Sequence, residues 1–374
     1  MDNAEQLRSA YEWCTGRLAN VEIRTEPFPA TLEAVDYMRG LNGVKEYPSH
    51  YASLDQRRRF TANLVSEIRG EIRTRTTVIA VHQVPGGYVI ESVPESSRTH
   101  QFDFVQAVVV ATGRFGGAAL ENKSFLSPIP TALSRYEFGI RIESPSSIGF
   151  LSRLRAADVK RVWRVGGTEI RTFCTCRDGE IWKVNSAGMS AISGRSDGAR
   201  SGFSNFGLLA RFDARLEESH RIWNAIKVGT RRESPVQWEP LASFLGLVTE
   251  QGSRINASTR PWFPNQRFLR GNLRTALGNE LHTILTHAVR DLLKWSPDLE
   301  NEETVCLFPA LEGIGCYPEL DMSLRISSHR VWCAGDVVGR FRGLIPSLVS
   351  GYYAGMSLAE MQQEHASISE ATLV

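Results

Sequence analysis

The stretch that decides the fold is VWCAGDVVGRFRGLIP, residues 331–346. It opens with large apolar residues and continues with Ala-Gly-Asp, which predicts a short strand that ends in a glycine and an aspartate. The residues that follow favour a helix running to about Gln363. In open α/β sheets, ligands bind at the carboxyl ends of the strands. We therefore expect a ligand site at Asp336.

Two features of this segment are typical of a site for a polar ligand. An aspartate at the carboxyl end of a strand can accept hydrogen bonds from ligand hydroxyls, and the following helix presents unpaired N–H groups and partial positive charge at its N-terminus. Gly351, Gly355 and Ala359 recur at four-residue intervals in that helix. We expect these small residues to let the helix axis approach a strand or a ligand closely.

A second strand and a hairpin are predicted earlier in the chain. Residues 105–110 are rich in valine and lead into Ala-Thr-Gly, residues 111–113. Because β-branched residues bounded by glycine are typical of interior strands, we predict a strand buried on both faces. Residues 77–82 and 88–93 flank a Pro-Gly-Gly turn and predict a hairpin.

Three further elements are expected nearer the N-terminus. Apolar residues recur at helical spacing over residues 4–18, and a strand candidate follows at residues 21–25. Residues 53–56 have the spacing of a capping box, and the helix that they begin should end at Gly70. This helix is expected to turn three apolar residues inward: Phe60, Leu64 and Ile68.

The middle of the chain has the pattern of an antiparallel sheet. Residues 136–143 alternate apolar and polar side chains, which predicts a strand with one face in water. Residues 170–176 and 180–184 flank Arg-Asp-Gly and predict a hairpin. One helix should present a single apolar face: Leu281, Ile284, Leu285, Ala288, Leu292 and Trp295. We therefore expect an inserted α+β domain over residues 115–325.

Composition excludes several classes of protein. The 374 residues include 43 Lys+Arg and 41 Asp+Glu, and hydrophobic residues make up 42%. These values exclude wholesale disorder and give no general attraction for nucleic acid or an anionic membrane. We interpret the basic run at residues 57–59 as a solvated helix face. No apolar run approaches the length of a membrane span, and the N-terminus lacks the order of a secretory signal.

The cysteines and histidines predict neither disulfides nor a metal. Six cysteines in a chain of this length do not make a disulfide framework, and no C-x-x-C occurs. The eight histidines are scattered, without the spacing of zinc ligands. We therefore expect a reduced, cytoplasmic protein that holds no metal.

Several short motifs together resemble one family. The strand-Gly-Asp-loop-helix segment and the earlier VVVATG are similar to those of bacterial FAD-dependent dehydrogenases of the glutathione-reductase-like flavoprotein class. Middle segments add to the resemblance, which covers most of residues 45–360: FGIRIE at 138–143, RTFC at 171–174, SNF at 204–206, PALE at 309–312 and ELD at 319–321.

The resemblance implies FAD as the cofactor. Asp336 would contact the ribityl-pyrophosphate part, Gly335 would give access, and Ala111, Thr112 and Gly113 would line the dinucleotide side. The N-terminus of the last helix would face the flavin N1/O2 edge, where negative charge collects on reduction. The implied cofactor-binding residues are Ala111, Thr112, Gly113, Gly335, Asp336, Arg342, Gly343, Leu344 and Ile345.

The family's phosphate-binding motif is missing from this sequence. The family begins with a strand, G-x-G-x-x-G and a helix, yet no G-x-G-x-x-G occurs in the chain, either for FAD or for a nicotinamide. Glu26 is discounted as a ribose ligand because no phosphate loop precedes it. Three interpretations stay open: a second polypeptide supplies the missing strands, the chain start is misassigned or truncated, or FAD binding has been lost.

The fold class expected is α/β. It comprises an incomplete, Rossmann-like FAD-binding domain formed by both chain ends, residues 1–114 and 326–374, with the inserted antiparallel domain as the substrate domain. The function expected is the FAD-binding subunit of an oxidoreductase that acts on a small molecule, in complex with a second chain. The alternative is a non-catalytic, partner-binding or regulatory protein on a degenerate flavoprotein scaffold.

Catalytic side chains are not identified. Cys174 and Cys176 share one face of a predicted strand, where packing is favoured over an approach to the flavin. His282 and His287 lack ligand spacing and are expected to be solvated or capping. Glu312 matches a family position, and a loop role and a contact with substrate or flavin both stay open for it.

Overall fold

The computed structural model describes residues 5, 12, 44–46, 54–120, 131–153, 159–186, 188–196, 199–213, 215–248, 255, 257–262 and 268–371. Of the helix predicted over residues 4–18, Glu5 and Glu12 are helical and exposed, and the rest lies outside the described residues. The strand predicted over residues 21–25 also lies outside them. None of the described helices is both long and apolar enough to cross a bilayer.

The chain divides into two compact units. The first comprises Met1–Glu22, Arg59–Ser134 and Gly313–Val374, and the second comprises Ile23–Arg58 and Arg135–Glu312. Helix α3 (Leu54–Glu67) and strands β6 (Thr131–Pro145) and β14 (Val305–Pro318) run through the boundaries between these segments. Each unit is described separately below.

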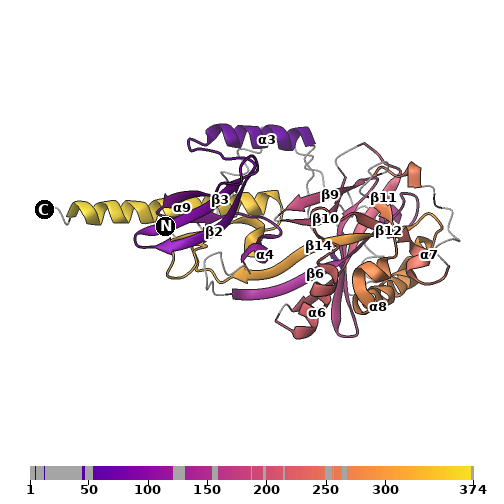
Figure 1. Cartoon of the computed structure of the whole chain (residues 1–374). Coiled ribbons are helices and arrows are strands. Elements are labelled where there is room, and N and C mark those ends of the chain that lie inside the picture. The colour runs from indigo at the N-terminus through magenta and orange to yellow at the C-terminus, as the bar shows by residue number, and fades with distance from the viewer. Residues whose placement is uncertain are drawn as a thin grey trace. The chain divides into compact units, whose positions relative to one another are not determined.

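The first unit combines a meander, whose strands β2 and β3 are labelled in Figure 1, with a short parallel pair. Strands β2, β3 and β4 form a three-stranded antiparallel sheet, and β5 pairs with β15. Its elements are β2 (Thr76–Val84), β3 (Gly87–Pro94), β4 (Gln101–Val105), β5 (Val108–Val110), α4 (Gly116–Leu120), β15 (Val331–Cys333), the 3₁₀ turn η3 (Gly335–Val338) and α9 (Leu344–Ala371).

The elements predicted around the meander are confirmed in part. The hairpin is present, with β2 and β3 paired up to Val84 and Gly87. Helix α3 begins within the predicted capping box and buries Phe60, and the arginines at 57–59 are exposed as expected. The helix ends at Glu67, however, so the inward position predicted for Ile68 is wrong: this side chain is 54% exposed.

The predicted strand at residues 105–110 is divided between two sheets. Val105 is the last residue of β4 and lies opposite Tyr88 of β3. Only Val108–Val110 forms β5, which runs parallel to β15. Burial on both faces is also wrong, because Val110 belongs to the unit's apolar core while Val109, which points the other way, is 44% exposed.

Helix α9 approaches β15 through a different face from the one predicted. Gly351, Gly355 and Ala359 are exposed, and a Cβ added at either glycine would meet nothing within 4 Å. The buried face instead carries Ala354, which packs with Trp332 of β15. Two other small residues, Ser347 and Ser350, are half-buried and buried. The helix therefore does approach β15 through small residues, but they lie on a different face of the helix from the predicted stripe.

The second unit is built on a large mixed sheet. Its strands follow the order β1-β7-β8-β11-β6-β14-β12-β13, and each described pairing within it is antiparallel except that between β12 and β13. A separate hairpin pairs β9 with β10. The strands not yet defined are β1 (Val44–Glu46), β7 (Val159–Val165), β8 (Thr168–Cys176), β9 (Glu180–Ser186), β10 (Met189–Arg195), β11 (Phe203–Asp213), β12 (Val236–Pro240) and β13 (Phe268–Arg270).

Helices cover one face of this sheet. Tyr136 and Phe138 of β6 stack on Trp223 of α6 (Glu217–Ile226), and α8 (Leu273–Trp295) packs beside α6 (Figure 1). The single apolar face predicted for this helix is confirmed, since Leu281, Leu285, Ala288 and Leu292 are buried. The remaining helical turns are α5 (Phe150–Arg153), α7 (Leu241–Phe244), η1 (Ala257–Thr259) and η2 (Pro297–Leu299).

The opposite face of β6 is buried too, contrary to the sequence prediction. Glu137, Arg141 and Glu143 point away from the helices but are almost fully buried. The β9–β10 hairpin covers this face, since Gly194 of β10 lies directly against the Arg141 guanidinium. Alternating polarity indicated a face in water; here it marks a polar layer that a second β layer encloses.

The hairpin predicted across residues 177–179 does not form. Strand β8 pairs with β7 and β11 in the large sheet, whereas β9 pairs only with β10 among the described strands. The Arg-Asp-Gly segment is therefore a corner between two layers. A turn motif specifies a reversal of the chain but does not specify which strand pairs with which.

Gly194 provides a test of the enclosed polar layer. A Cβ at this position would overlap Arg141 Nη2 and lie 2.6 Å from Asn205 Oδ1. We expect Gly194→Ala to lower the free energy of unfolding by about 1–3 kcal/mol, because overpacking displaces buried groups. Urea unfolding of the variant measures this loss. Gly351→Ala is the control, expected to be neutral or slightly stabilising because its methyl group meets open space in a helix.

Candidate functional site

The predicted site residues follow two parallel strands at the same edge of their sheet. Val108 lies opposite Val331 and Val110 opposite Cys333, so the segments after each strand emerge together. The amide of Ala334 donates to the carbonyl of Val110 at 2.9 Å and extends the pairing by one residue. Ala111, Thr112 and Gly113 therefore begin beside Ala334, Gly335 and Asp336.

Two glycines at this edge adopt a backbone conformation that other residues rarely take. Gly113 and Gly335 both have φ near +75°. The left-handed region is sterically open to glycine but strained for residues with a Cβ. Each glycine turns the chain away from its strand. The two strands therefore end opposite each other, at Val110 and Cys333.

Asp336 carries an acceptor atom that lacks a hydrogen bond. Its Oδ1 is buried and accepts no hydrogen bond among the described residues. The Arg342 Nε lies 3.2 Å from this oxygen, within ion-pair distance, but its N–H does not point at the oxygen. Both side chains are about one fifth to one quarter exposed. The carboxylate is therefore neutralised in charge while one lone-pair direction stays available to a donor.

One serine of α9 attaches the helix to the same edge, and a second bonds to the loop that leads into the helix. The Gly335 amide donates to Ser350 Oγ at 2.8 Å, and Ser347 Oγ donates to the Phe341 carbonyl at 3.0 Å. Gly343, with φ +96°, turns the chain into the helix, whose first residue Leu344 is 43% exposed. The first turn of a long helix therefore lies in the segment that also contains Asp336 and Arg342. Ile345, the last residue of the predicted set, is half-buried.

Two glycines that sequence reasoning missed fit α4 closely against this edge. A Cβ on Gly116 would lie 2.5 Å from Val337 Cγ2, and one on Gly117 would lie 2.5 Å from the Ile314 carbonyl oxygen. Both glycines lie a few residues after Ala-Thr-Gly in the sequence, and this doubled glycine is the sequence signal for a close approach.

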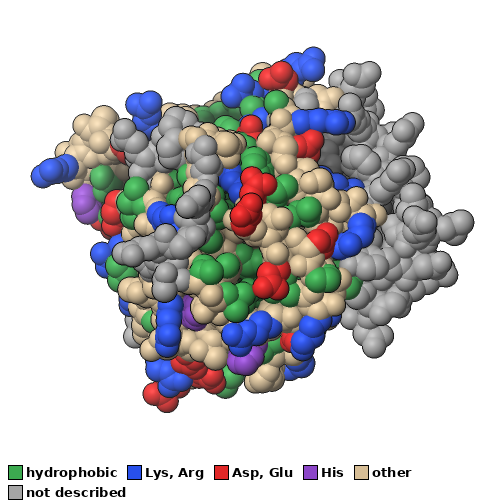
Figure 2. Space-filling model, turned by 90° about the vertical axis from the view of Figure 1, so that its right-hand side faces the viewer, with side chains coloured by type: hydrophobic (Ala, Val, Ile, Leu, Met, Phe, Trp, Pro, Cys, Tyr) green, Lys and Arg blue, Asp and Glu red, His purple; other side chains and the backbone are tan. Residues whose placement is uncertain are grey.

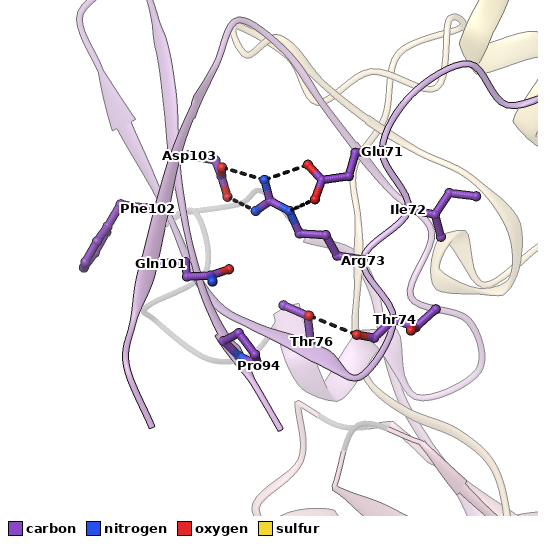
Figure 3. Close-up of a pocket in the computed structure, with 9 residues that line it drawn as sticks. All are labelled: Glu71, Ile72, Arg73, Thr74, Thr76, Pro94, Gln101, Phe102 and Asp103. Carbon is purple, nitrogen blue, oxygen red and sulfur yellow. Dashed lines mark hydrogen bonds and ion pairs between the residues drawn. The ribbon is translucent and has the colours of Figure 1, made fainter. Parts of the chain in front are cut away.

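An open pocket of about 670 Å³ lies elsewhere in the first unit, on the meander (Figure 3). Arg73 projects into it and pairs with Asp103 at 2.5 Å and with Glu71 at 2.9 Å. The guanidinium beside them lowers the pKa of both carboxyls. Because two carboxylates already match this cation, the pocket offers no excess positive charge to an anion. None of the predicted cofactor-binding residues lines it.

The second unit contains a row of buried charges on β6, β8 and β11. Glu137 accepts hydrogen bonds from Arg171, at 2.7 Å, and from Arg211, which also pairs with Glu169. Arg141, four residues further along β6 on the same face, donates to Asn205 Oδ1. Three of the family-like segments of the sequence, FGIRIE, RTFC and SNF, supply members of this row.

Glu143 ends the row and is held by two donors. Arg260 Nη1 and Trp262 Nε1 both donate to its Oε1, at 3.2 and 2.9 Å, while its buried Oε2 accepts no hydrogen bond among the described residues. Burial raises the pKa of Glu143 to about 7, although Arg260, Trp262 and Arg141 oppose the shift. Burial also lowers the pKa of Arg260, so this ion pair is held against a desolvation penalty on both sides.

The remaining candidate residues are two histidines and a glutamate, and they differ in exposure. His282 packs against Phe244, and burial lowers its pKa, while His287 is exposed. Glu312 is 2% exposed and lies within β14, so the loop role left open for it is wrong. No group of three or more His, Cys, Asp or Glu side chains in the described part of the chain is arranged to hold a metal ion. On the face shown in Figure 2, the basic and acidic side chains drawn in colour are interspersed.

Comparison with known proteins gives no family for this chain. No family model matches it, and no curated protein is similar to it. A solved structure from Exiguobacterium sp. 255-15, described as a protoporphyrinogen oxidase, aligns with 84% of this chain and 52% of its own at 9% identity, with a TM-score of 0.36. BexE, described in connection with oxidation during BE-7585A biosynthesis, aligns with 98% of this chain and 64% of its own at 11% identity, with a TM-score of 0.32.

The chain spans about half of the first structure's length and just under two thirds of the second's. Both TM-scores lie below 0.5.

Gly335 allows the strained turn to be tested. We expect Gly335→Ala to lower the free energy of unfolding by about 1–2 kcal/mol, because alanine is disfavoured at positive φ. Gly335→Asn should recover part of this loss, since asparagine tolerates the left-handed region. Urea unfolding of both variants measures the difference, and equal stabilities for Gly335→Ala and the wild type would contradict the strain.

Glu143 predicts a pH dependence. Its folded-state pKa of about 7 lies above the ordinary value of 4.5, so the folded protein binds this proton more tightly than the unfolded chain. Its contribution to stability is complete below about pH 4.5 and is lost as the pH rises through about 7. Relative to Glu143→Gln, the wild type should lose about 3 kcal/mol between about pH 5 and pH 8. Urea titrations measure this, and parallel pH profiles would refute it.

Proposed function

We propose that the first unit binds FAD and that the protein is the FAD-binding subunit of an oxidoreductase. The observation that carries the proposal is the buried Oδ1 of Asp336, which accepts no hydrogen bond among the described residues and follows one of two parallel strands at their shared carboxyl edge. Ligands of open α/β sheets bind at such edges. The resemblance of this segment to flavoprotein dehydrogenases supplies the identity of the ligand.

The residues present fit a flavin dinucleotide. Asp336 would accept a hydrogen bond from a ribityl hydroxyl, which satisfies its unpaired oxygen. Arg342 keeps this carboxylate neutralised, so that an anionic pyrophosphate meets no net negative charge. Gly113 and Gly335, whose missing Cβ atoms face open space or only Ser347, would let the dinucleotide approach the backbone. The remaining predicted residues, Ala111, Thr112, Gly343, Leu344 and Ile345, flank these positions.

The chemistry supplied by bound FAD would be hydride or electron transfer with a small-molecule substrate. This chain's own residues would orient the cofactor, and the first-turn amides of α9 would stabilise negative charge on the flavin ring. The second unit, with its enclosed polar layer, would form the substrate domain. We place the enzyme in the cytoplasm, as its reduced cysteines favour.

A second polypeptide is proposed to supply the phosphate-binding G-x-G-x-x-G segment. Among the described strands β5 has one neighbour, β15, so its other edge is open to a further strand. Exposed Val109 lies in this strand. Parallel strands are stable when both faces and both edges are covered, so a two-stranded parallel pair favours completion by added strands.

The alternative function is a non-catalytic, partner-binding protein on a scaffold that no longer binds flavin. The observation that favours it is the meander's outer surface, where Phe102 and Phe104 are 63% and 60% exposed. Large apolar side chains left in water are typical of protein interaction surfaces. This alternative predicts a stable protein without cofactor.

The two functions are separated by purifying the chain after co-expression with the products of neighbouring genes. A yellow complex that absorbs in the flavin band supports the oxidoreductase, and a colourless, stable, partner-free monomer refutes it. In the yellow complex, Asp336→Ala should weaken FAD retention about tenfold to a hundredfold, as expected for loss of a charge-assisted hydrogen bond. Asp103→Ala removes another arginine-paired carboxylate of the same unit and should leave flavin content unchanged.

A further inference from the structure

Strand β8 contains a bulge at its two cysteines. Its pairing with β11 runs from Phe173 opposite Gly207 to Cys176 opposite Asn205, so β8 has one residue more than its partner between these pairs. Cys174, within the bulge, has φ +46°, a conformation that residues with a Cβ rarely adopt. The bulge breaks the regular alternation that would hold two cysteines apart at i and i+2.

The Cys176 thiol lies against the bulge. It donates to the Cys174 carbonyl oxygen at 3.5 Å, and an interaction with the Cys174 side chain raises the pKa of the Cys176 thiol. Arg141 Nη2 donates to the same carbonyl at 2.6 Å and to Cys176 Sγ at 3.5 Å. A buried guanidinium therefore contacts both cysteines, one through its backbone and the other through its sulfur.

The cysteines differ in access to solvent. Cys174 is half-buried and Cys176 is buried. The hydrogen bond with Cys174 and burial raise the pKa of the Cys176 thiol, and the charge of Arg141 opposes this. A dissolved oxidant therefore reaches Cys174 first, and Cys176 is positioned to react with the product.

We propose that Cys174 and Cys176 are a peroxide-sensitive dithiol that closes to an intramolecular disulfide. This inference is independent of the proposed flavin site, which lies in the other unit. The sequence alone does not indicate this dithiol, because C-x-C in a regular strand separates its sulfurs and the chain has no C-x-x-C.

The reaction balances with hydrogen peroxide as the oxidant. The Cys174 sulfur displaces water from peroxide and becomes a sulfenic acid, which takes two electrons from sulfur. The Cys176 sulfur then attacks the Cys174 sulfur, the S–OH bond breaks, and hydroxide leaves with the Cys176 thiol proton as a second water. In sum, two thiols and one peroxide yield one disulfide and two waters.

Disulfide formation would be transmitted to the enclosed polar layer. Arg141 has no ion pair with the described residues, and its bonds go to Asn205 and to the two cysteines. Any movement of the bulge therefore changes the partners of a buried cation, against which Gly194 leaves no spare space. The dithiol is a chemical switch built next to a closely packed, buried cation of the second unit.

Peptide mapping of the wild-type protein tests the proposal without any mutation. Trypsin cleaves after Arg171 and Arg177, which leaves both cysteines in one short peptide, residues 172–177. After peroxide treatment of the folded protein and alkylation without reduction, this peptide should lack both alkyl groups and two hydrogen atoms. Cys316, also half-buried but outside this pair, is the internal control and should stay alkylated.

Two variants assign the roles of the thiols. Cys176→Ser should retain a sulfenic acid at residue 174 that dimedone traps, and Cys174→Ser should show no oxidation at residue 176. Phenylarsine oxide, which bridges two adjacent thiols, should be retained by the folded wild type and lost in both variants. Double alkylation of the wild-type peptide after peroxide, or oxidation to sulfinic acid without disulfide, overturns the proposal.

Discussion

Parallel pairing of Val108–Val110 with Val331–Cys333 is the interaction on which the first unit depends. It joins segments from opposite parts of the sequence and brings the turns at Gly113 and Gly335 to one edge. Only three residues of each strand take part, so ladder hydrogen bonds alone would be marginal. Buried side chains compensate: Val110, Val331, Cys333 and Val337 form one apolar cluster.

The same pairing explains why the proposed site has its polar character. Asp336 lies just beyond the last paired residue, where the sheet no longer supplies hydrogen-bond partners, and the chain leads from there into α9. Serines rather than larger residues attach the helix, so its first turn stays close to the strand ends. A partly buried carboxylate with an arginine beside it is tolerated there because charge is balanced even where hydrogen bonding is incomplete.

The second unit differs from the first in that it encloses charged side chains between two β layers. Glu137, Arg141 and Glu143 lie on one face of one strand, and each forms hydrogen bonds with neighbours on other strands or loops. Gly194 leaves the room that the Arg141 side chain needs, and Gly139 lets β6 lie close to the Leu208 backbone of β11. The bulge at Cys174 belongs to the same arrangement, since its carbonyl is one of the acceptors that hold Arg141.

Local pattern in the sequence determined the elements themselves. The hairpin at Gly87, the apolar face of α8 and the short strand before Gly335 were all predictable, because periodicity and turn residues act over a few residues. Tertiary structure alone decided what covers each face and which strands pair: the alternation at residues 136–143 meant a polar layer rather than water, and the exposed stripe at Gly351 and Gly355 turned out to face away from β15. The physical reason is that a side chain's own sequence neighbours specify its direction, whereas its burial depends on a distant segment that arrives only when the chain folds.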